Sequence, residues 1–158
     1  MARAPAAFAD ATRRRLLAAL AALPFAGALA RAQAAGPLVT VYKTATCGCC
    51  NDWVKHLRAN GFRVEAHDVE DLGAVKRRFG IPRALASCHT ARAGGYRIEG
   101  HVPAREIRRL LAERPEAAGL AVPGMPLGSP GMEAGRREPY AVLLFRADGR
   151  TSVYARYP

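Results

Sequence analysis

The sequence predicts a single α/β domain, and three observations support this class. The chain has 158 residues and is 50% hydrophobic, which is enough for one core and too little for two. Segments that alternate polar and apolar residues, as half-buried strands do, are interleaved with segments of helical periodicity. The connections between them are short, which favours a parallel strand pair with a right-handed crossover.

The first four elements follow in order along the chain. Residues 38 to 44, LVTVYKT, are rich in β-branched and aromatic side chains and predict a strand that ends at a group of cysteines. A helix is expected from Cys50 to the stop signal at Asn60-Gly61. Residues 62 to 69, FRVEAHDV, alternate as a second strand with one covered face, and residues 70 to 80 predict a short helix.

Three more elements complete the predicted domain. Residues 87 to 92 and 96 to 102 are extended segments that the Ala-Gly-Gly between them joins as a hairpin. Pro103 opens a helix whose apolar residues lie on one face. The resulting order, β-α-β-α-β-β-α, is typical of a thioredoxin-like domain.

A Pro/Gly-rich extension is expected from about residue 119. Residues 119 to 139 have no periodicity, and such a loop in a compact domain is usually functional or disordered. Residues 140 to 157 then predict a terminal β-hairpin that turns at Asp148-Gly149. We therefore expect residues 37 to 158 to form one domain that includes this extension.

Residues 1 to 32 have the pattern of an export signal. A run of three arginines precedes an apolar stretch from Leu16 to Ala30, and small residues favour cleavage near Ala32. The Arg run resembles a twin-arginine signal, although arginines are also common in ordinary export signals. No later segment is apolar enough to cross a membrane. We expect a periplasmic protein without a membrane anchor.

The net charge does not point to a nucleic acid. The formal charge is +11, but the first 32 residues alone hold five arginines against one aspartate. The remaining basic residues are scattered among acidic ones rather than gathered in one run. We expect a mildly basic soluble domain with no nucleic-acid partner.

Three of the four cysteines, Cys47, Cys49 and Cys50, lie within four positions where the first strand meets the first helix. Cys47 and Cys50 have C-x-x-C spacing, and the first helical turn favours a thiolate. Cys49 and Cys50 are poor partners for each other because a disulfide between neighbours closes a strained ring. The predicted pair is Cys47 with Cys50.

A third sulfur in this segment, with Cys88, favours a metal site over a plain dithiol. We expect Cys88 to begin the third strand, which lies beside the first in this topology, so that four sulfurs converge. Clustered soft thiolates select Cu(I), Zn²⁺ or an iron–sulfur cluster. Adjacent sulfurs can bridge two ions, which favours polynuclear copper. Zinc is the second choice because its structural sites usually take ligands from two knuckles, and the spacings match no common ferredoxin pattern.

Other soft or borderline donors are candidates beside the cysteines. Met125 and Met132 lie in the extension, each after Pro-Gly, and are either Cu(I) ligands or flexible side chains that fill a hydrophobic gap. His101 lies at a loop mouth, where it could ligate a metal or hydrogen-bond a ligand sulfur. His89 follows Cys88, and because strand neighbours point to opposite faces we expect it to point away from the cluster.

Two other classes of function remain open from the residues alone. A thiol–disulfide oxidoreductase would act through Cys47 and Cys50, but such enzymes usually place proline inside the C-x-x-C motif, where this chain has Cys49. An exported scaffold would pair all four cysteines, for example Cys47 with Cys50 and Cys49 with Cys88.

Four motifs in one order resemble the CopG-type copper-resistance proteins, long catalogued as a metal-binding domain of unknown function. The resemblance covers about residues 38 to 158. The motifs are Cys47-Gly48-Cys49-Cys50, Ser87-Cys88-His89-Thr90, Gly100-His101-Val102-Pro103 and the VPGMPLGSPGME run of residues 122 to 133.

This resemblance implies a thioredoxin-like domain that holds a thiolate-bridged multicopper cluster beside the C-x-C-C motif. It implies that Cys47, Cys49 and Cys50 are ligands, that Cys88 is the fourth, and that the loop from Met125 to Met132 lies over the site. The implied role is interconversion of Cu(I) and Cu(II) in periplasmic copper resistance, which leaves open whether the protein is a copper oxidoreductase or a copper store or chaperone. We expect a monomer whose partners are copper ions and copper efflux or other periplasmic copper proteins.

Overall fold

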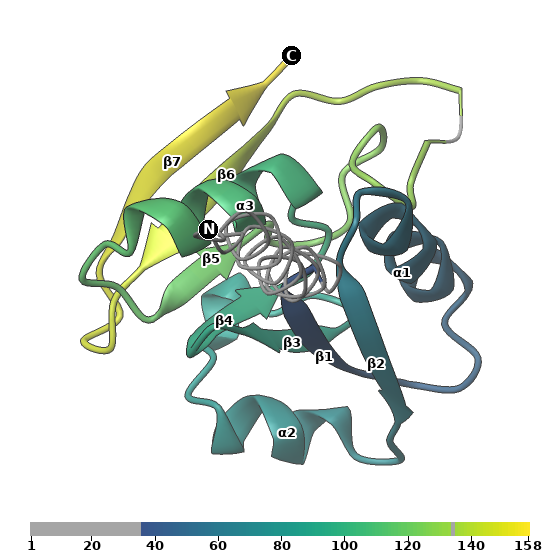
Figure 1. The fold of residues 1–158 in the computed structure, drawn as a ribbon, viewed down its shortest axis with the longest axis horizontal. Helices are drawn as coiled ribbons and strands as arrows, with labels where there is room; N and C mark the ends of the chain where they lie inside the picture. Colours follow the sequence, from purple (N-terminus) through teal and green to yellow (C-terminus); the bar gives the residue numbers. More distant parts are fainter. Residues whose placement is uncertain (1–35, 134) are drawn as a thin grey trace, which may run out of the picture. The chain divides into compact units, whose positions relative to one another are not determined.

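The described part of the chain forms a seven-stranded mixed sheet with helices packed on it (Figure 1). The computed structural model describes residues 36 to 133 and 135 to 158, so the predicted export signal lies outside the described residues. The elements are β1 (Leu38–Lys43), α1 (Gly48–Ala59), β2 (Arg63–Asp68), α2 (Leu72–Arg78), the 3-10 helix η1 (Arg83–Leu85), β3 (Thr90–Ala93), β4 (Tyr96–Glu99), α3 (Ala104–Glu113), β5 (Gly119–Ala121), β6 (Tyr140–Phe145) and β7 (Thr151–Tyr157).

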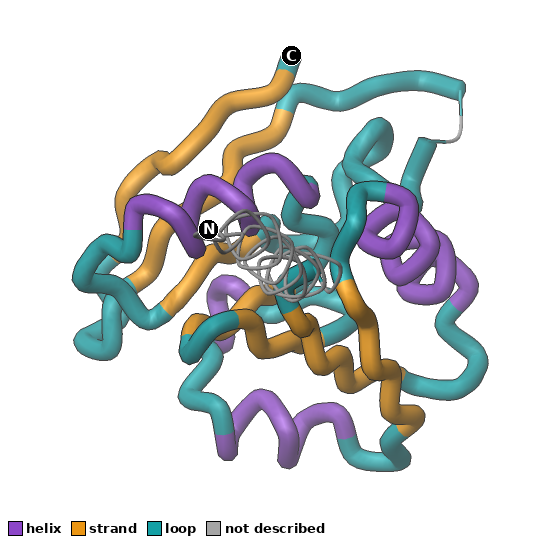
Figure 2. The backbone as a smooth tube through the Cα atoms, viewed as in Figure 1, coloured by secondary structure: helices purple, strands orange, loops and turns teal. Residues whose placement is uncertain are grey.

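The strand order is β2-β1-β3-β4-β5-β6-β7, with the strands labelled in Figure 1 and coloured orange in Figure 2. Strands β1 and β2 are parallel and joined through α1, whereas β3 runs antiparallel to both β1 and β4. The α/β class is confirmed, and this order of the first four strands is compatible with the predicted thioredoxin-like fold. Because β3 lies beside β1, the loop before β3 and the loop after β1 meet at one end of the sheet.

The extension contains a strand that the sequence pattern did not predict. Strand β5 pairs in parallel with β4 and antiparallel with β6, so the predicted terminal hairpin continues the same sheet. A Cβ atom on Gly119 would collide with the carbonyl oxygen of Arg97, so only glycine allows this approach. Three residues of Gly-Leu-Ala carry little strand propensity of their own, and pairing on both sides decides their conformation.

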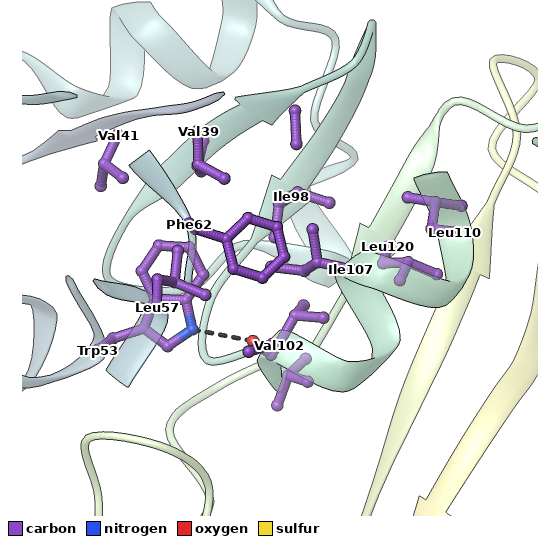
Figure 3. Packing of buried hydrophobic residues seen from close by; sticks show 14 of the residues in the cluster. Val39, Val41, Trp53, Leu57, Phe62, Ile98, Val102, Ile107, Leu110 and Leu120 are labelled. Atoms are coloured by element: carbon purple, nitrogen blue, oxygen red, sulfur yellow. Dashed lines mark hydrogen bonds between the residues drawn. The ribbon is translucent and has the colours of Figure 1, made fainter. Parts of the chain in front are cut away.

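The main core lies between the sheet and the helices α1 and α3 (Figure 3). Trp53 is fully buried, as expected for a core residue, and its indole N–H donates to the carbonyl oxygen of Val102 over 2.9 Å. The labelled residues of this cluster come from both helices, from β1, β4 and β5, and from the loops that contain Phe62 and Val102. This packing fixes α1, and with it the cysteines of its first turn, against the sheet.

The second strand is less buried than predicted, and the second helix lies outside the core. Phe62 is buried and Val64 is partly buried, but Ala66 is exposed, so the predicted covered face of the strand over residues 62 to 69 is only half formed. Strand β2 is an edge strand, and α2 contributes no buried residue to the core. Among the described residues, no helix is long and apolar enough to cross a membrane.

Candidate metal centre

The N-terminus of α1 presents three cysteines. Cys47 is the N-cap residue, and the helix begins at Gly48, two residues before the predicted start at Cys50, so both Cys49 and Cys50 belong to the first turn. The free N–H groups of this turn and the helix dipole favour negative charge on these sulfurs. The backbone N–H of Cys47 donates to the carbonyl oxygen of Thr44, which closes the turn between β1 and α1.

The predicted pairing of Cys47 with Cys50 is confirmed. The two residues form a disulfide, with a Cα–Cα distance of 5.3 Å. Cys49 and Cys88 carry free thiols whose sulfurs lie 3.9 Å apart. The structure therefore contains one of the two disulfides that a purely structural scaffold would form.

All four sulfurs converge at one point, which confirms the predicted convergence of the four cysteines. Their Sγ atoms lie within 4.8 Å of one another. Cys49 is central, because its sulfur lies 3.6 Å from that of Cys47 and 3.9 Å from that of Cys88. The sulfur of Cys50 is buried and lies 3.6 Å from the carbonyl oxygen of Cys88.

The position of Cys88 differs from the prediction. It lies in the loop between η1 and β3, and the strand begins only at Thr90. The alternation of strand side chains therefore does not apply to Cys88 and His89. The expectation that His89 points away from the cluster is wrong, since its Nδ1 atom lies 3.3 Å from the sulfur of Cys88.

His101 is held against the cluster from both sides of its ring. Its Nδ1 atom lies 2.7 Å from the carbonyl oxygen of Pro130, and its Nε2 atom lies 3.0 Å from the sulfur of Cys88. A carbonyl oxygen can only accept a hydrogen bond, so Nδ1 carries the proton and Nε2 presents a lone pair to Cys88. The prediction that this imidazole reaches a cluster sulfur is confirmed, and ligation of a metal by it stays a prediction.

His89 is a further nitrogen donor that the sequence pattern missed. Its ring is fully buried between Trp53, 4.3 Å away between ring centroids, and His101, 5.1 Å away. Its Nε2 atom has no hydrogen-bond partner among the described residues. Cys88, His89 and His101 form a second group whose donor atoms lie within 4.8 Å of one another. The Cys88-His89 dipeptide could have indicated this second donor. The predicted strand began too early, which placed the two side chains on opposite faces.

Burial sets the protonation states around Cys88. Burial, followed by the neighbouring Cys49, raises the pKa of the Cys88 thiol to about 12. Burial also lowers the pKa of His101, and it lowers that of His89 well below its ordinary value with help from the charges of His101 and Lys76. Near neutral pH the two imidazoles are therefore neutral, and a metal that binds Cys88 must displace a proton.

The Pro/Gly-rich loop packs on the first turn of α1. Gly131 has a φ of +88°, and a Cβ atom there would lie 2.7 Å from the carbonyl oxygen of Cys49 and 3.3 Å from Nδ1 of His101. Met132 follows Gly131 and is partly buried, whereas Met125 is 50% exposed. The loop thus lies over the site as expected, and ligation by either methionine stays a prediction.

The donor set suits a soft metal ion. In the described part of the chain, the two groups of convergent metal-binding side chains contain sulfur and imidazole nitrogen and no carboxylate. Such donors fit Cu(I) and Zn²⁺ and do not fit Mg²⁺ or Ca²⁺, which prefer oxygen. The residues present therefore fit copper, with zinc as the competing ion.

Comparison with known proteins agrees with this chemistry. A family described as "Protein of unknown function, DUF411" matches residues 85 to 132, and no curated protein matches the chain. Two solved structures are similar to the protein, both of a copper resistance protein copG. Form 2 is 50% identical with a TM-score of 0.75 and covers 78% of this chain and 99% of its own. Form 1 is 51% identical with a TM-score of 0.73 and covers 77% and 97%.

Proposed function

Because this chain belongs to the CopG family of copper resistance proteins, we propose that it binds copper through its four cysteines and serves copper resistance in the periplasm. The convergence of the sulfurs of Cys47, Cys49, Cys50 and Cys88 within 4.8 Å carries this proposal. The export pattern of residues 1 to 32 supports the location.

The arrangement of the sulfurs favours a thiolate-bridged cluster over a single ion. Cys49 lies between Cys47 and Cys88 at 3.6 and 3.9 Å, so its thiolate is the natural bridge between two copper ions. His101 and His89 add neutral nitrogen donors on the Cys88 side. Thiolates stabilise Cu(I), and imidazoles also accept Cu(II). A site with both kinds of donor supports interconversion of the two oxidation states.

Copper binding to all four cysteines depends on the redox state of the protein. The Cys47–Cys50 disulfide offers no thiolate, so two electrons must reduce it before both sulfurs can act as ligands. A copper store or chaperone needs the same ligands and no electron partner. Reversible oxidation of the loaded protein separates these two roles.

The experiment is an anaerobic Cu(I) titration of the reduced mature protein, with metal analysis and a visible absorption spectrum before and after an oxidant. More than one copper per chain, with thiolate charge-transfer bands that change reversibly, is the expected result. Zn²⁺ is titrated in parallel, and stronger retention of zinc than of copper would contradict the assignment.

A thiol–disulfide oxidoreductase is the second candidate, and one observation favours it. The Cys47–Cys50 disulfide lies at a helix N-terminus, where the freed thiolate is stabilised. Protein that binds no copper and titrates as a simple two-electron dithiol would support this alternative. The Cys49→Ser variant would then keep its full disulfide-reductase activity.

A further inference from the structure

Glu99 is a fully buried carboxylate at the end of β4, next to the metal centre in sequence but not part of its donor set. It accepts three hydrogen bonds. The backbone N–H of Ser87 donates over 2.6 Å, the hydroxyl of Thr90 over 2.7 Å, and the ammonium group of Lys76 over 2.5 Å. The backbone N–H of Ser87 and the ammonium group of Lys76 can only donate, so they favour the charged carboxylate and oppose the effect of burial, which raises the pKa of Glu99.

Two of these donors belong to the residues that flank Cys88 and His89 in the sequence. Ser87 and Thr90 are the neighbours of the dipeptide Cys88-His89, one on each side. A single side chain therefore holds both ends of this segment. The backbone N–H of Gly100 adds a bond to the carbonyl oxygen of His89 over 3.1 Å. Cys88 lies outside the strands, between two residues that Glu99 contacts.

The ion pair with Lys76 explains how the carboxylate of Glu99 can remain charged although it is buried. The side chain of Lys76 is only 15% exposed, and its ammonium group also donates to the hydroxyl of Thr90 over 3.0 Å. A buried carboxylate without such a partner is strongly destabilising. Helix α2 places no residue in the core. Its contact with the buried part of the protein at this site is the ion pair of Lys76 with Glu99.

We propose that Glu99, balanced by Lys76, is a positioning residue that holds Cys88 and His89 at the cysteine cluster. The effect on copper rests on the proposed function, whereas the effect on the Cys88 segment does not. A buried ion pair adds little net stability compared with an apolar pair of similar size. Positioning of the segment is the role that the contacts support.

The first test needs no copper. In a Cys49→Ser background with the Cys47–Cys50 disulfide intact, Cys88 is the single free thiol. Adding Glu99→Gln should increase the rate of Cys88 alkylation by maleimide about tenfold, because lost charge-assisted hydrogen bonds raise the open population of the segment. Thr90→Val removes the hydrogen bonds of the hydroxyl to Glu99 and from Lys76 without a change of charge. It should act in the same direction, which separates loop opening from an electrostatic effect on the thiol.

Glu106→Gln is the matched control. Glu106 is also a fully buried carboxylate, but it contacts Arg105, Arg109 and the hydroxyl of Tyr157 instead of the Cys88 segment. It should leave the alkylation rate unchanged. Equal rates in the Glu99→Gln, Thr90→Val and parent proteins, or an equal increase in Glu106→Gln, would overturn the proposal.

The second test uses Cu(I) on reduced protein with all four cysteines. Glu99→Gln should bind less copper per chain and show altered charge-transfer bands, while Glu106→Gln matches the wild type. If Glu99→Gln fails to fold, the double variant Lys76→Met with Glu99→Leu replaces it, because it removes both charges together. Wild-type protein that binds no copper would refute the proposed function, and the alkylation rates would still decide the role of Glu99. A faster-alkylating Glu99→Gln protein with unchanged copper content and bands would refute positioning for copper.

Discussion

The Nε2 atom of His101 lies 3.0 Å from the sulfur of Cys88, and this contact joins the loop after β4 to the loop before β3. The opposite ring nitrogen is bound to the carbonyl oxygen of Pro130 in the extension. The extension therefore determines which nitrogen faces the sulfur. This relationship links the Pro/Gly-rich segment to the chemistry of the cluster without requiring a side chain of the segment to bind metal.

Replacement of His101 by Asn should weaken Cu(I) binding by about 10- to 100-fold, the range typical of lost ligand-orienting contacts. The measurement is competition with a colorimetric Cu(I) chelator under anaerobic conditions. His67→Asn is the control, because His67 lies on the exposed edge strand β2 and stacks on Tyr42. Equal Cu(I) affinities of the two variants would show that His101 does not contribute to copper binding.

The Cys49→Ser variant should bind fewer copper ions per chain than the wild type, because the central sulfur is the one placed to bridge. Its Cys47–Cys50 disulfide should still form, since Cys49 takes no part in it. Metal analysis and thiol counting on the same sample check both statements. Unchanged stoichiometry would show that Cys49 does not bridge.

Gly131→Ala should destabilise the protein by about 1 to 3 kcal/mol more than Gly124→Ala, the range for inserting a methyl group into a packed site. Both glycines have a positive φ, of +88° and +70°, so both variants carry backbone strain. Only at Gly131 does the new methyl group meet Cys49 and His101, whereas Gly124 has open space. Denaturation followed by the fluorescence of Trp53, the single tryptophan, gives the difference. Equal losses would show that the loop does not pack tightly on α1.

His56 should make stability depend on pH near neutrality. Its Nε2 atom accepts a hydrogen bond from the backbone N–H of Ala104 at the start of α3, and burial lowers its pKa below 6.5 despite the opposing charge of Glu133. The unfolded state then binds a proton first, so this contribution is complete above the unfolded pKa and is lost as pH falls below it. His56→Gln keeps an acceptor and does not titrate. Its melting temperature should fall less than that of the wild type between about pH 7 and pH 5, and parallel curves would contradict this assignment.

Export should depend on the arginine pair of the leader if the twin-arginine interpretation is correct. Replacement of Arg13 and Arg14 by Lys should then prevent accumulation of the mature protein in the periplasm. Cell fractionation and the size of the accumulated chain measure this. Undiminished export would favour an ordinary export signal.

The cysteine cluster was predictable because it depends on few features. A strand that ends shortly before Cys47, a helix that begins beside it and a neighbouring third strand place Cys88 near the motif, although its predicted position within the strand was wrong. The errors came from boundaries. The sequence pattern predicted an extended segment over residues 87 to 92 and therefore placed His89 on the face that points away from the site. In the structure, β3 begins only at Thr90. The short strand β5 lacked any local pattern, because its partners lie in β4 and β6.

The amino-acid sequence by itself determined the α/β class, the soft metal-binding side chains and their spacing along the chain. These features depend on side-chain type and on the periodicity of neighbouring residues, which can be read from short segments. Only the tertiary structure decided that His101 faces Cys88, that Gly131 packs on Cys49, and that Glu99 holds the segment around Cys88. These relationships join residues 9 to 82 positions apart. Which buried polar groups meet across such separations depends on how the whole sheet and its helices pack, and no short stretch of sequence contains that information.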